Sequence, residues 1–293
     1  MTSLCRADIC ELCIICYSTS RYFRSSVNSC GLAFGNRNTP EIQSIASCSV
    51  SVVVSFFQWW TGELLGLFPA LRSRARTADR QPTIALDGDG DRLVMVDAAG
   101  QLYDGDQLLY VIAKHRQALG KLQGGVVGTL MTNLAFEHPM KKLNIPFVRA
   151  KVGDRYVMEL LQQHGWQLGG ENSGHIICLD KHSTGDGIVS ALQVLHALRA
   201  TQQNLTQAAS GLQMYPQVLI NVRVAKGVDC LGHDQVKSAV SDAEQVLNGK
   251  GRVLLRPSGT EPLLRVMVEG EDKQLVEQSA QRISDVVRRL AAA

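Results

Sequence analysis

The sequence predicts an α/β protein in which helices cover a mixed sheet, followed by a small two-layer α+β domain at the C-terminus. Two observations predict this fold class. From residue 83 onward, short strand-like runs alternate with longer segments of helical periodicity, as is typical of α/β layers. From residue 217 the order changes to strand, helix, strand, strand and helix, which indicates a separate α+β unit.

Each element before residue 205 is predicted from a local pattern. The expected strands are 83–86, 93–97, 126–131, 147–151, 166–168 and 175–179, and the expected helices are 107–119, 133–143, 155–164 and 187–200. We expect Asp106 to cap the first of these helices and Gly120 to end it. Pro139 lies inside the second helix, where a proline removes one helical hydrogen bond and kinks or breaks the helix.

The elements of the C-terminal unit follow a polar connector over residues 201–216. The expected strands are 217–225, 253–256 and 263–269, and the expected helix between the first two is 234–247. Asp272 is expected to cap a last helix, whose apolar positions recur at helical spacing from Leu275 to Leu290. This order predicts a small sheet with two helices packed on it.

The first 82 residues differ in composition from the rest of the chain. They hold six of the eight cysteines and eight arginines but no lysine, and they show little periodicity. The apolar run 49–60 fits either one strand or a buried segment, because short apolar runs do not distinguish the two. The spacing C-x2-C-x2-C begins at Cys10, but an iron–sulfur run would need a cysteine at Ser20, and a zinc site would need a further ligand such as Cys30. We expect an atypical leader, with a metal-binding protein as the alternative.

Charge and hydropathy exclude several classes of function. The net charge of +3 is too small to indicate a nucleic-acid partner by itself. The longest apolar run, around residues 50–60, is far shorter than the roughly 20 residues of a membrane helix. Residues 1–16 lack the layout of a signal peptide. We therefore expect a cytoplasmic protein without a nucleic-acid or membrane partner, and the sequence leaves the oligomeric state open.

Three aspartates follow the strand expected at 83–86. Asp87, Asp89 and Asp91 alternate with glycines in D-G-D-G-D-R, so their side chains point to one side of an extended loop. Three carboxylates in so small a space are costly unless a cation binds, and all-oxygen ligation suits Mg2+ or Ca2+. An EF-hand would need Gly and Glu where this loop has Arg92 and Ala98. The loop predicts an Mg2+ site, with an Asp-Gly hairpin turn as the alternative.

Three further loops carry polar side chains suited to a ligand. V-G-D-R-Y at 152–156 lies at a strand-to-helix junction, where helix amides attract anions, unless Asp154 only caps the helix. G-G-E-N-S-G-H at 169–175 offers Glu171 and Ser173 on one side of a turn, which suits vicinal sugar hydroxyls. R-P-S-G-T-E-P at 256–262 combines arginine, hydroxyls and loop amides, which is typical of a phosphate cradle. The loop 169–175 could instead be a glycine-rich hairpin, and the loop 256–262 a polar hairpin.

These four loops, in this order, resemble those of the α-D-phosphohexomutase family over about residues 83–293. The resemblance is strongest to the branch that interconverts glucosamine 6-phosphate and glucosamine 1-phosphate for amino-sugar synthesis, an isomerase and phosphotransferase reaction. It implies Mg2+ as the cofactor and a glucosamine phosphate as the substrate. The implied metal ligands are Asp87, Asp89 and Asp91, and the implied catalytic cation is Arg92. The residues implied to bind substrate are Arg155, Glu171, Ser173, His175, Arg256, Ser258, Gly259, Thr260 and Arg265.

The family also carries a catalytic serine in a loop similar to S-A-S-H-N-P, and no S-H-N-P occurs in these 293 residues. We therefore expect a truncated chain that is inactive alone. The domains expected are a leader over 1–82, a remnant of the metal-binding domain over 83–97, a sugar-binding α/β domain over 98–205 and a phosphate-binding α+β domain over 212–293. The alternatives are a non-catalytic Mg2+ and sugar-phosphate binding module, or a fragment specific for mannose or glucose phosphates.

Overall fold

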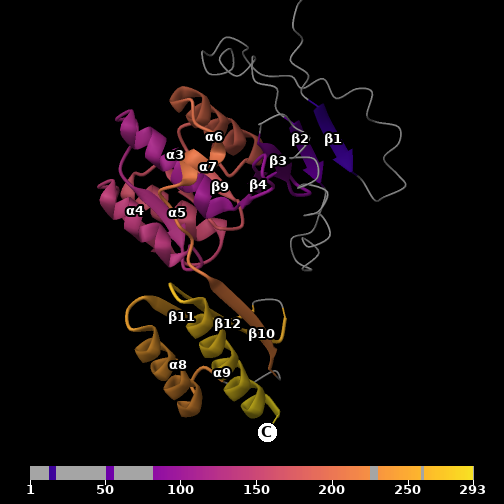
Figure 1. The fold of residues 1–293 in the computed structure, drawn as a ribbon, viewed down its shortest axis with the longest axis vertical. Coiled ribbons are helices and arrows are strands. Elements are labelled where there is room, and N and C mark those ends of the chain that lie inside the picture. Colours follow the sequence, from indigo (N-terminus) through magenta and orange to yellow (C-terminus); the bar gives the residue numbers. More distant parts are fainter. Residues whose placement is uncertain (1–12, 18–50, 56–81, 225–229, 259–260, 293) are drawn as a thin grey trace, which may run out of the picture. The chain divides into compact units, whose positions relative to one another are not determined.

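The computed structural model describes residues 13–17, 51–55, 82–224, 230–258 and 261–292 (Figure 1). These residues form two compact units. The first unit holds the described residues up to Thr132 together with Pro139–Leu212, and the second holds Asn133–His138 with those from Gln213 onward. No helix among the described residues is long and apolar enough to cross a membrane. Cys10, Ser20 and Cys30, on which the iron–sulfur and zinc alternatives depend, lie outside the described residues.

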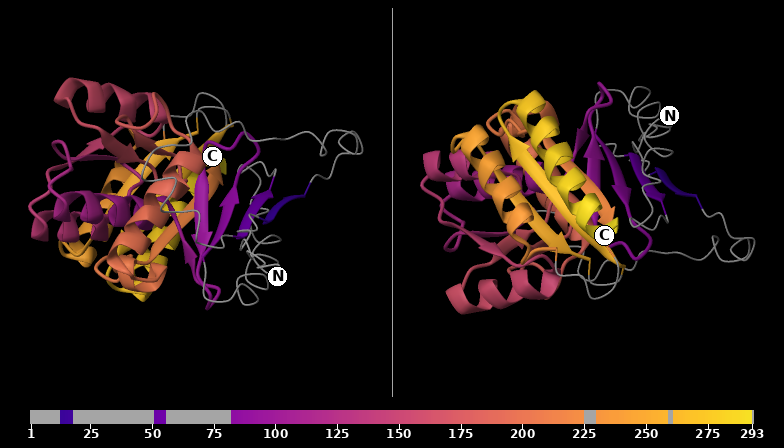
Figure 2. Two further views of the ribbon diagram at one scale, coloured as in Figure 1. Left: turned by 90° about the horizontal axis from the view of Figure 1, so that it is seen from above. Right: turned by 90° about the horizontal axis from the view of Figure 1, so that it is seen from below.

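A five-stranded sheet in the first unit positions the aspartate loop. Its order is β1 (Cys13–Tyr17), β2 (Ser51–Ser55), β3 (Thr83–Leu86), β4 (Leu93–Val96) and β5 (Leu102–Tyr103). The pairs β1–β2 and β2–β3 are parallel, whereas β3–β4 and β4–β5 are antiparallel (Figure 2). The run 49–60 therefore contributes a strand over its residues 51–55. Every residue of β3 and β4 is buried, so the D-G-D-G-D-R loop extends from a hairpin that is held firmly on both faces.

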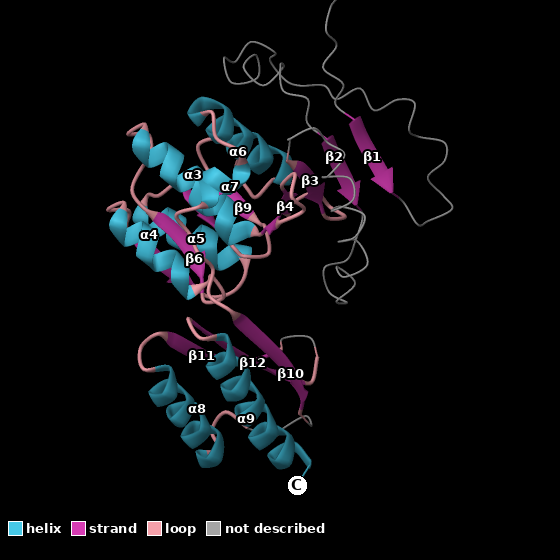
Figure 3. Ribbon diagram, in the orientation of Figure 1, coloured by secondary structure: helices cyan, strands magenta, loops and turns pink. Residues whose placement is uncertain are grey.

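A second sheet of the first unit has the order β7-β6-β8-β9. Its strands are β6 (Val126–Thr129), β7 (Phe147–Ala150), β8 (Leu168–Gly170) and β9 (Ile176–Cys178). The helices of the first unit include α3 (Gly105–Ala118), α5 (Asp154–His164), α6 (Gly187–Thr201) and α7 (Leu205–Ala209) (Figure 3). Because β6 pairs in parallel with β7 and β8 while β9 is antiparallel, the sheet is mixed, which confirms the predicted fold class. Val157 and Leu161 of α5 are fully buried against Val127 of β6.

Helix α3 begins earlier than predicted. Its N-cap is Asp104, whose carboxylate accepts a hydrogen bond from the backbone N–H of Gln107 at 3.1 Å. The Gln107 side chain accepts in return from the N–H of Asp104 at 3.3 Å, which completes a capping box. The prediction of Asp106 as the cap was wrong: Asp106 is buried within the first turn, and Asp104 is the aspartate with a glutamine three residues later. Gly120, with φ +63°, follows the end of the helix as expected.

The helix predicted over 133–143 is divided in two. Leu134–Phe136 form a 3-10 turn, and α4 (Glu137–Lys142) follows it. Asn133 caps the turn, because its side-chain oxygen accepts from the N–H of Ala135 at 3.1 Å. Pro139 is the third residue of α4, where a backbone N–H has no partner within the helix, so the proline removes no helical hydrogen bond. The predicted helix is therefore divided, with its α-helical part starting just before the proline.

The second unit has the predicted order β10 (Gln217–Arg223), α8 (Asp234–Leu247), β11 (Gly251–Pro257), β12 (Leu263–Gly270) and α9 (Lys273–Ala292). Its antiparallel sheet has β12 in the centre, and α8 and α9 pack on one face of it (Figure 3). That face buries Val222, Val266 and Val268 against apolar side chains of both helices. Asp272 accepts from the N–H groups of Gln274 and Leu275, which confirms it as the cap of α9.

A polar contact fixes residues 133–138 to this second unit. Glu269 of β12 has no exposed surface, and its carboxylate accepts from the N–H of Leu134 at 3.1 Å, from Gln217 Nε2 at 2.9 Å and from Arg252 Nε. Asn133 donates to the carbonyl of Tyr215 at 3.0 Å and accepts from its N–H at 3.0 Å. A segment from the middle of the sequence is therefore held by a buried carboxylate of the C-terminal sheet.

The Glu269 contact predicts a large stability effect. Replacing Glu269 with alanine removes the acceptor for three donors, so we expect Glu269→Ala to lower the free energy of unfolding by about 2–3 kcal/mol. Urea denaturation followed by circular dichroism measures this change. Glu277→Ala on the exposed face of α9 is the matched control, for which no measurable change is expected. Equal stabilities of the two variants would contradict the role assigned to Glu269.

Candidate functional site

The three predicted aspartates meet at the tip of the β3–β4 hairpin. One carboxylate oxygen from each of Asp87, Asp89 and Asp91 lies within 4.8 Å of the other two. The tip is closed by the N–H of Gly90, which donates to the Asp87 carbonyl at 3.3 Å, and Gly90 has φ +77°, a left-handed conformation that favours glycine. The N–H of Arg92 donates to Asp87 Oδ1 at 3.1 Å. The loop is thus an Asp-Gly hairpin turn, but one that brings three carboxylates together.

Burial and charge both act on Asp87. Burial raises the pKa of its carboxyl from 3.8 to about 6, the hydrogen bond from the Arg92 N–H opposes this, and the negative charges of Asp91 and Asp89 add to the rise. The guanidinium of Arg92 gives limited relief, because its Nε lies 3.8 Å from both Asp87 Oδ2 and Asp91 Oδ1. The site holds more negative charge than the neighbouring protein groups neutralise.

The donor set fits a hard divalent cation. Carboxylate oxygens are the ligands that Mg2+ prefers, and three of them leave octahedral positions for water or a phosphate oxygen. Asp91 Oδ1 is buried and has no hydrogen-bond partner among the described residues, so this atom is available as a ligand. A cation at this place would offset the repulsion from Asp91 and Asp89, which adds to the effect of burial on the pKa of Asp87.

The loop 169–175 packs directly against the metal loop. Arg92 and His175 form an antiparallel bridge, and the N–H of Leu93 donates to the Gly174 carbonyl at 3.1 Å. Gly174 has φ +93°, and a Cβ built on it would lie 2.1 Å from the Leu93 carbonyl oxygen, so no other residue fits there. His175 is buried, and its Nδ1 lies 3.7 Å from Asp91 Oδ2. Two of the four predicted loops are therefore brought together.

Glu171 joins this loop to a third one. Its carboxylate is buried, and Oε1 accepts from the N–H of Gly153 at 2.8 Å, while the Ser173 hydroxyl lies 3.5 Å from Oε2. Gly153 belongs to V-G-D-R-Y and is the N-cap of α5, so the alternative in which Asp154 caps this helix was wrong. Arg155, in the first turn of α5, is exposed, and its Nε lies 3.0 Å from Glu159 Oε1.

The fourth loop lies in the second unit. Arg256 of β11 and Arg265 of β12 stand directly opposite each other, on the face of the sheet away from α8 and α9. Like charges directly across a strand pair repel, and a bound anion would relieve this repulsion. The Ser258 N–H donates to the Leu263 carbonyl at 2.8 Å, and its hydroxyl lies 3.3 Å from the N–H of Glu261. Gly259 and Thr260 lie outside the described residues.

Several contacts around the site could not be predicted from the sequence. The N–H of Gly187 donates to the Gly90 carbonyl at 2.9 Å, and the backbone N–H of Gly153 binds Glu171.

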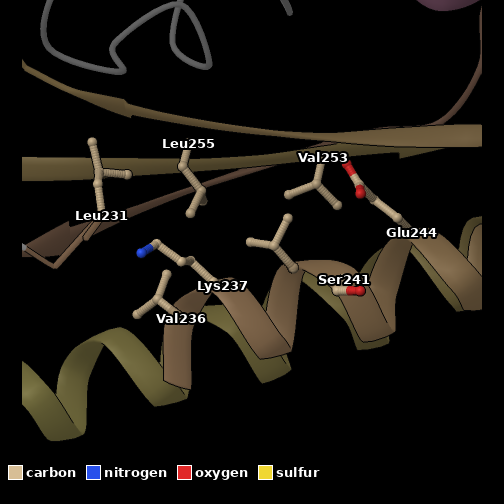
Figure 4. Close-up of a pocket in the computed structure, with 8 residues that line it drawn as sticks. Leu231, Val236, Lys237, Ser241, Glu244, Val253 and Leu255 are labelled. Atoms are coloured by element: carbon tan, nitrogen blue, oxygen red, sulfur yellow. The ribbon is translucent and has the colours of Figure 1, made fainter. Parts of the chain in front are cut away.

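A shallow pocket of about 290 Å³ lies between α8 and β11, lined by Leu231, Val236, Lys237, Val240, Ser241, Glu244, Val253 and Leu255 (Figure 4). It contains none of the predicted site residues.

Two family models match the chain. Residues 104–215 match the phosphoglucomutase/phosphomannomutase alpha/beta/alpha domain III, and residues 219–286 match the C-terminal domain of the same family. The chain belongs to the phosphoglucomutase/phosphomannomutase family. This finding confirms the family resemblance predicted from the four loops. Together the two matches cover more than half of the chain.

Curated relatives of this phosphohexomutase chain are named phosphoglucosamine mutase. The protein of Nitrosospira multiformis is 61% identical over 223 residues, which are 76% of this chain and 48% of that protein. The protein of Methylobacillus flagellatus is 64% identical over 209 residues, or 71% of this chain and 46% of that protein. The chain thus spans about half the length of the curated relatives it matches.

Solved structures support the fold. An N-acetylphosphoglucosamine mutase from Aspergillus fumigatus, solved in complex with GlcNAc-6P and magnesium, aligns with a TM-score of 0.63 at 21% identity, covering 76% of this chain and 53% of that one. A phosphoglucomutase/phosphomannomutase family protein from Burkholderia thailandensis aligns with a TM-score of 0.62 at 18% identity, covering 77% and 50%. The mixed α/β layers and the small C-terminal domain are therefore those of a phosphohexomutase fold.

The raised pKa of Asp87 predicts a pH dependence. Because the folded pKa, about 6, exceeds the ordinary value of 3.8, the folded state binds more protons between these pH values, and stability falls as the pH rises through this window. In EDTA, we expect Asp87→Asn to remove this loss and to stabilise the protein at pH 7.5 by about 1–2 kcal/mol, allowing for solvent screening. Urea midpoints at pH 4.5 and 7.5 measure the effect. Asp234→Asn, a fully exposed control, should show no such gain, and a gain equal to that of Asp87→Asn would contradict the assignment.

Proposed function

We propose that the chain carries the metal-binding and sugar-phosphate-binding parts of a phosphoglucosamine mutase, acting in the cytoplasm. The observation that carries the proposal is the convergence of Asp87, Asp89 and Asp91 at one hairpin tip, with the sugar loop packed against it. The high identity to relatives named phosphoglucosamine mutase supports glucosamine phosphates as the substrate class. The division into a remnant metal domain, a sugar domain over 98–205 and a phosphate domain over 212–293 is part of this proposal.

In this proposal the three aspartates hold Mg2+. A bound Mg2+ supplies positive charge that stabilises a transferring phosphoryl group. Arg92, at the root of the same hairpin, adds a second positive charge and holds Asp87 and Asp91 in place. Both roles depend on the buried β3–β4 hairpin, which fixes the directions of these side chains.

The remaining residues bind and orient the ligand. Ser173, His175 and Arg155 stand on or beside the loop that Glu171 fixes through Gly153, and we assign them with Glu171 to the sugar. Arg256, Arg265 and the loop residues Ser258, Gly259 and Thr260 are assigned to a phosphate. A bidentate guanidinium contact is well suited to phosphate, and two arginines directly opposite each other supply two such groups.

Turnover needs one further part, a nucleophile that carries the phosphoryl group between the two ends of the sugar. Direct transfer between the 1- and 6-positions is barred, because these oxygens lie at opposite ends of the molecule. The S-H-N-P motif that carries the serine in the family does not occur in the 293 residues. We therefore propose that this chain alone binds its ligands without converting them, which makes it a binding module by itself.

The metal assignment predicts a binding constant that depends on each aspartate. We expect Mg2+ to bind the protein with one-to-one stoichiometry, and Asp89→Ala to weaken binding by at least about tenfold, because one of three hard ligands is lost. Isothermal titration calorimetry measures both constants. Asp234→Ala, on exposed α8, is the control and should bind as the parent protein does. Absence of Mg2+ binding by the parent protein would refute the assignment.

The ligand assignment predicts binding without turnover. In the presence of Mg2+, glucosamine 6-phosphate should bind more tightly than mannose 6-phosphate or glucose 6-phosphate, and Arg265→Ala should weaken binding about 10- to 100-fold, since a hydrogen bond to a charged group is lost. Arg282→Ala, whose guanidinium pairs with Asp242 on the surface, is the control. Glucosamine 1-phosphate should form no faster than without protein, even with the 1,6-bisphosphate. Turnover that disappears in Asp89→Ala would show that another group of this chain carries the phosphoryl group.

A further inference from the structure

A turn far along the sequence from the metal loop lies directly behind it. Gly187 is the first residue of α6, and its N–H donates to the carbonyl of Gly90, in the middle of D-G-D-G-D-R, at 2.9 Å. Asp186, the N-cap of α6, stabilises this turn, because its carboxylate accepts a hydrogen bond from the N–H of Val189 at 2.9 Å. A Cβ built on Gly187 would lie 2.8 Å from the Gly90 carbonyl oxygen, so the close approach requires glycine.

Gly185, two residues earlier, makes room for the ring of His175. Gly185 forms an antiparallel bridge with Ile177, which places it beside the strand that follows His175. A Cβ built on Gly185 would lie 1.6 Å from His175 Nε2 and 1.8 Å from Cδ2. Its φ lies outside the left-handed region, so the space taken by the ring, not the backbone conformation, is what excludes a side chain.

The same ring touches the metal loop on its other side. His175 Nδ1 lies 3.7 Å from Asp91 Oδ2, and the backbone of His175 is bridged to Arg92. The ring therefore fills the space between Gly185 and Asp91, and it is 6% exposed, so it has little freedom to move elsewhere. The ring that lies against the Asp91 carboxylate therefore occupies space that is free only because Gly185 has no side chain.

We infer that Gly185 is a positioning residue for the metal loop, acting through His175 on Asp91. The inference rests on the proposed Mg2+ site. Groups that hold a metal ligand from outside fix its orientation, and changing them typically costs about 10- to 100-fold in metal affinity. A side chain at Gly185 overlaps the end of the His175 ring, so the ring moves and Asp91 loses the group that lies against it. Gly185 itself touches neither metal nor substrate.

The test compares Mg2+ affinities by calorimetry in folded variants. Gly185→Ala should weaken Mg2+ binding about 10- to 100-fold. The matched control is Gly211→Ala, because a Cβ on Gly211 would lie 2.0 Å from the Tyr110 hydroxyl, an overlap with the end of a side chain in the same unit. Gly211→Ala should lower the melting temperature without changing the Mg2+ affinity. Equal Mg2+ affinities of Gly185→Ala and the parent protein would overturn the inference.

A double-mutant cycle identifies the route of the effect. In a His175→Ala background the overlap no longer exists, so adding Gly185→Ala should change the Mg2+ affinity by less than about twofold. An equal loss in both backgrounds would show that Gly185 acts through the backbone, and would overturn the inference. If Gly185→Ala alone fails to fold, the double variant should still fold and should bind Mg2+ as His175→Ala does. A double variant that fails to fold would also overturn the inference. If the parent protein binds no Mg2+, the proposed metal site is refuted, and this inference with it. If the parent protein and Gly185→Ala bind Mg2+ equally well, only the inference is refuted.

Discussion

Repulsion among three carboxylates is the constraint around which the first unit is organised. Asp87, Asp89 and Asp91 lie within reach of one ion on a loop that joins two strands buried at every position. Protein groups offset only part of the repulsion, since the Arg92 guanidinium stays 3.8 Å away from the two carboxylates it faces. Burial raises the pKa of Asp87, and the negative charges of Asp91 and Asp89 add to that rise. A divalent cation is the ligand that would relieve this repulsion.

Close backbone contacts, more than side-chain contacts, hold the neighbouring loops in place. Gly174 approaches Leu93 so closely that a Cβ would overlap its carbonyl, and a Cβ on Gly105 would lie 2.0 Å from the carbonyl oxygen of Glu171. The Glu171 carboxylate then uses one oxygen to bind the N–H of Gly153. The glycines of the G-G-E-N-S-G-H loop therefore allow dense packing between loops. This packing explains how short polar loops can fix the directions of the side chains assigned to sugar binding.

Local sequence patterns predicted most of the helices and strands but few of the contacts between the loops. Helix α8 begins and ends where the spacing of Val236 and Leu247 predicts, and Asp272 caps α9 as expected, because these features depend on neighbours in the sequence. The errors at Asp106 and Pro139 arose where two local signals competed for one helix start. The contact between Leu134 and Glu269 joins residues 135 positions apart, and the Gly187–Gly90 hydrogen bond joins residues 97 positions apart. No periodicity or motif encodes such contacts, since they depend on the packed sheets.

Each unit brings side chains of like charge together at one place on its own sheet. The first unit collects carboxylates at the end of its β3–β4 hairpin, and the second places Arg256 opposite Arg265 on a sheet whose other face is packed by Val266 and two helices. In the first unit the folded structure holds three carboxylates within 4.8 Å of one another, and in the second it places two arginines at directly opposed positions of a strand pair. A cation in the first unit would reduce the repulsion among the three aspartates, and a phosphate in the second would place an anion between two arginines. Binding at either place would therefore gain free energy from relief of electrostatic repulsion as well as from direct contacts, which is the reason to expect affinity for Mg2+ and for phosphate in the ligand-binding module proposed above.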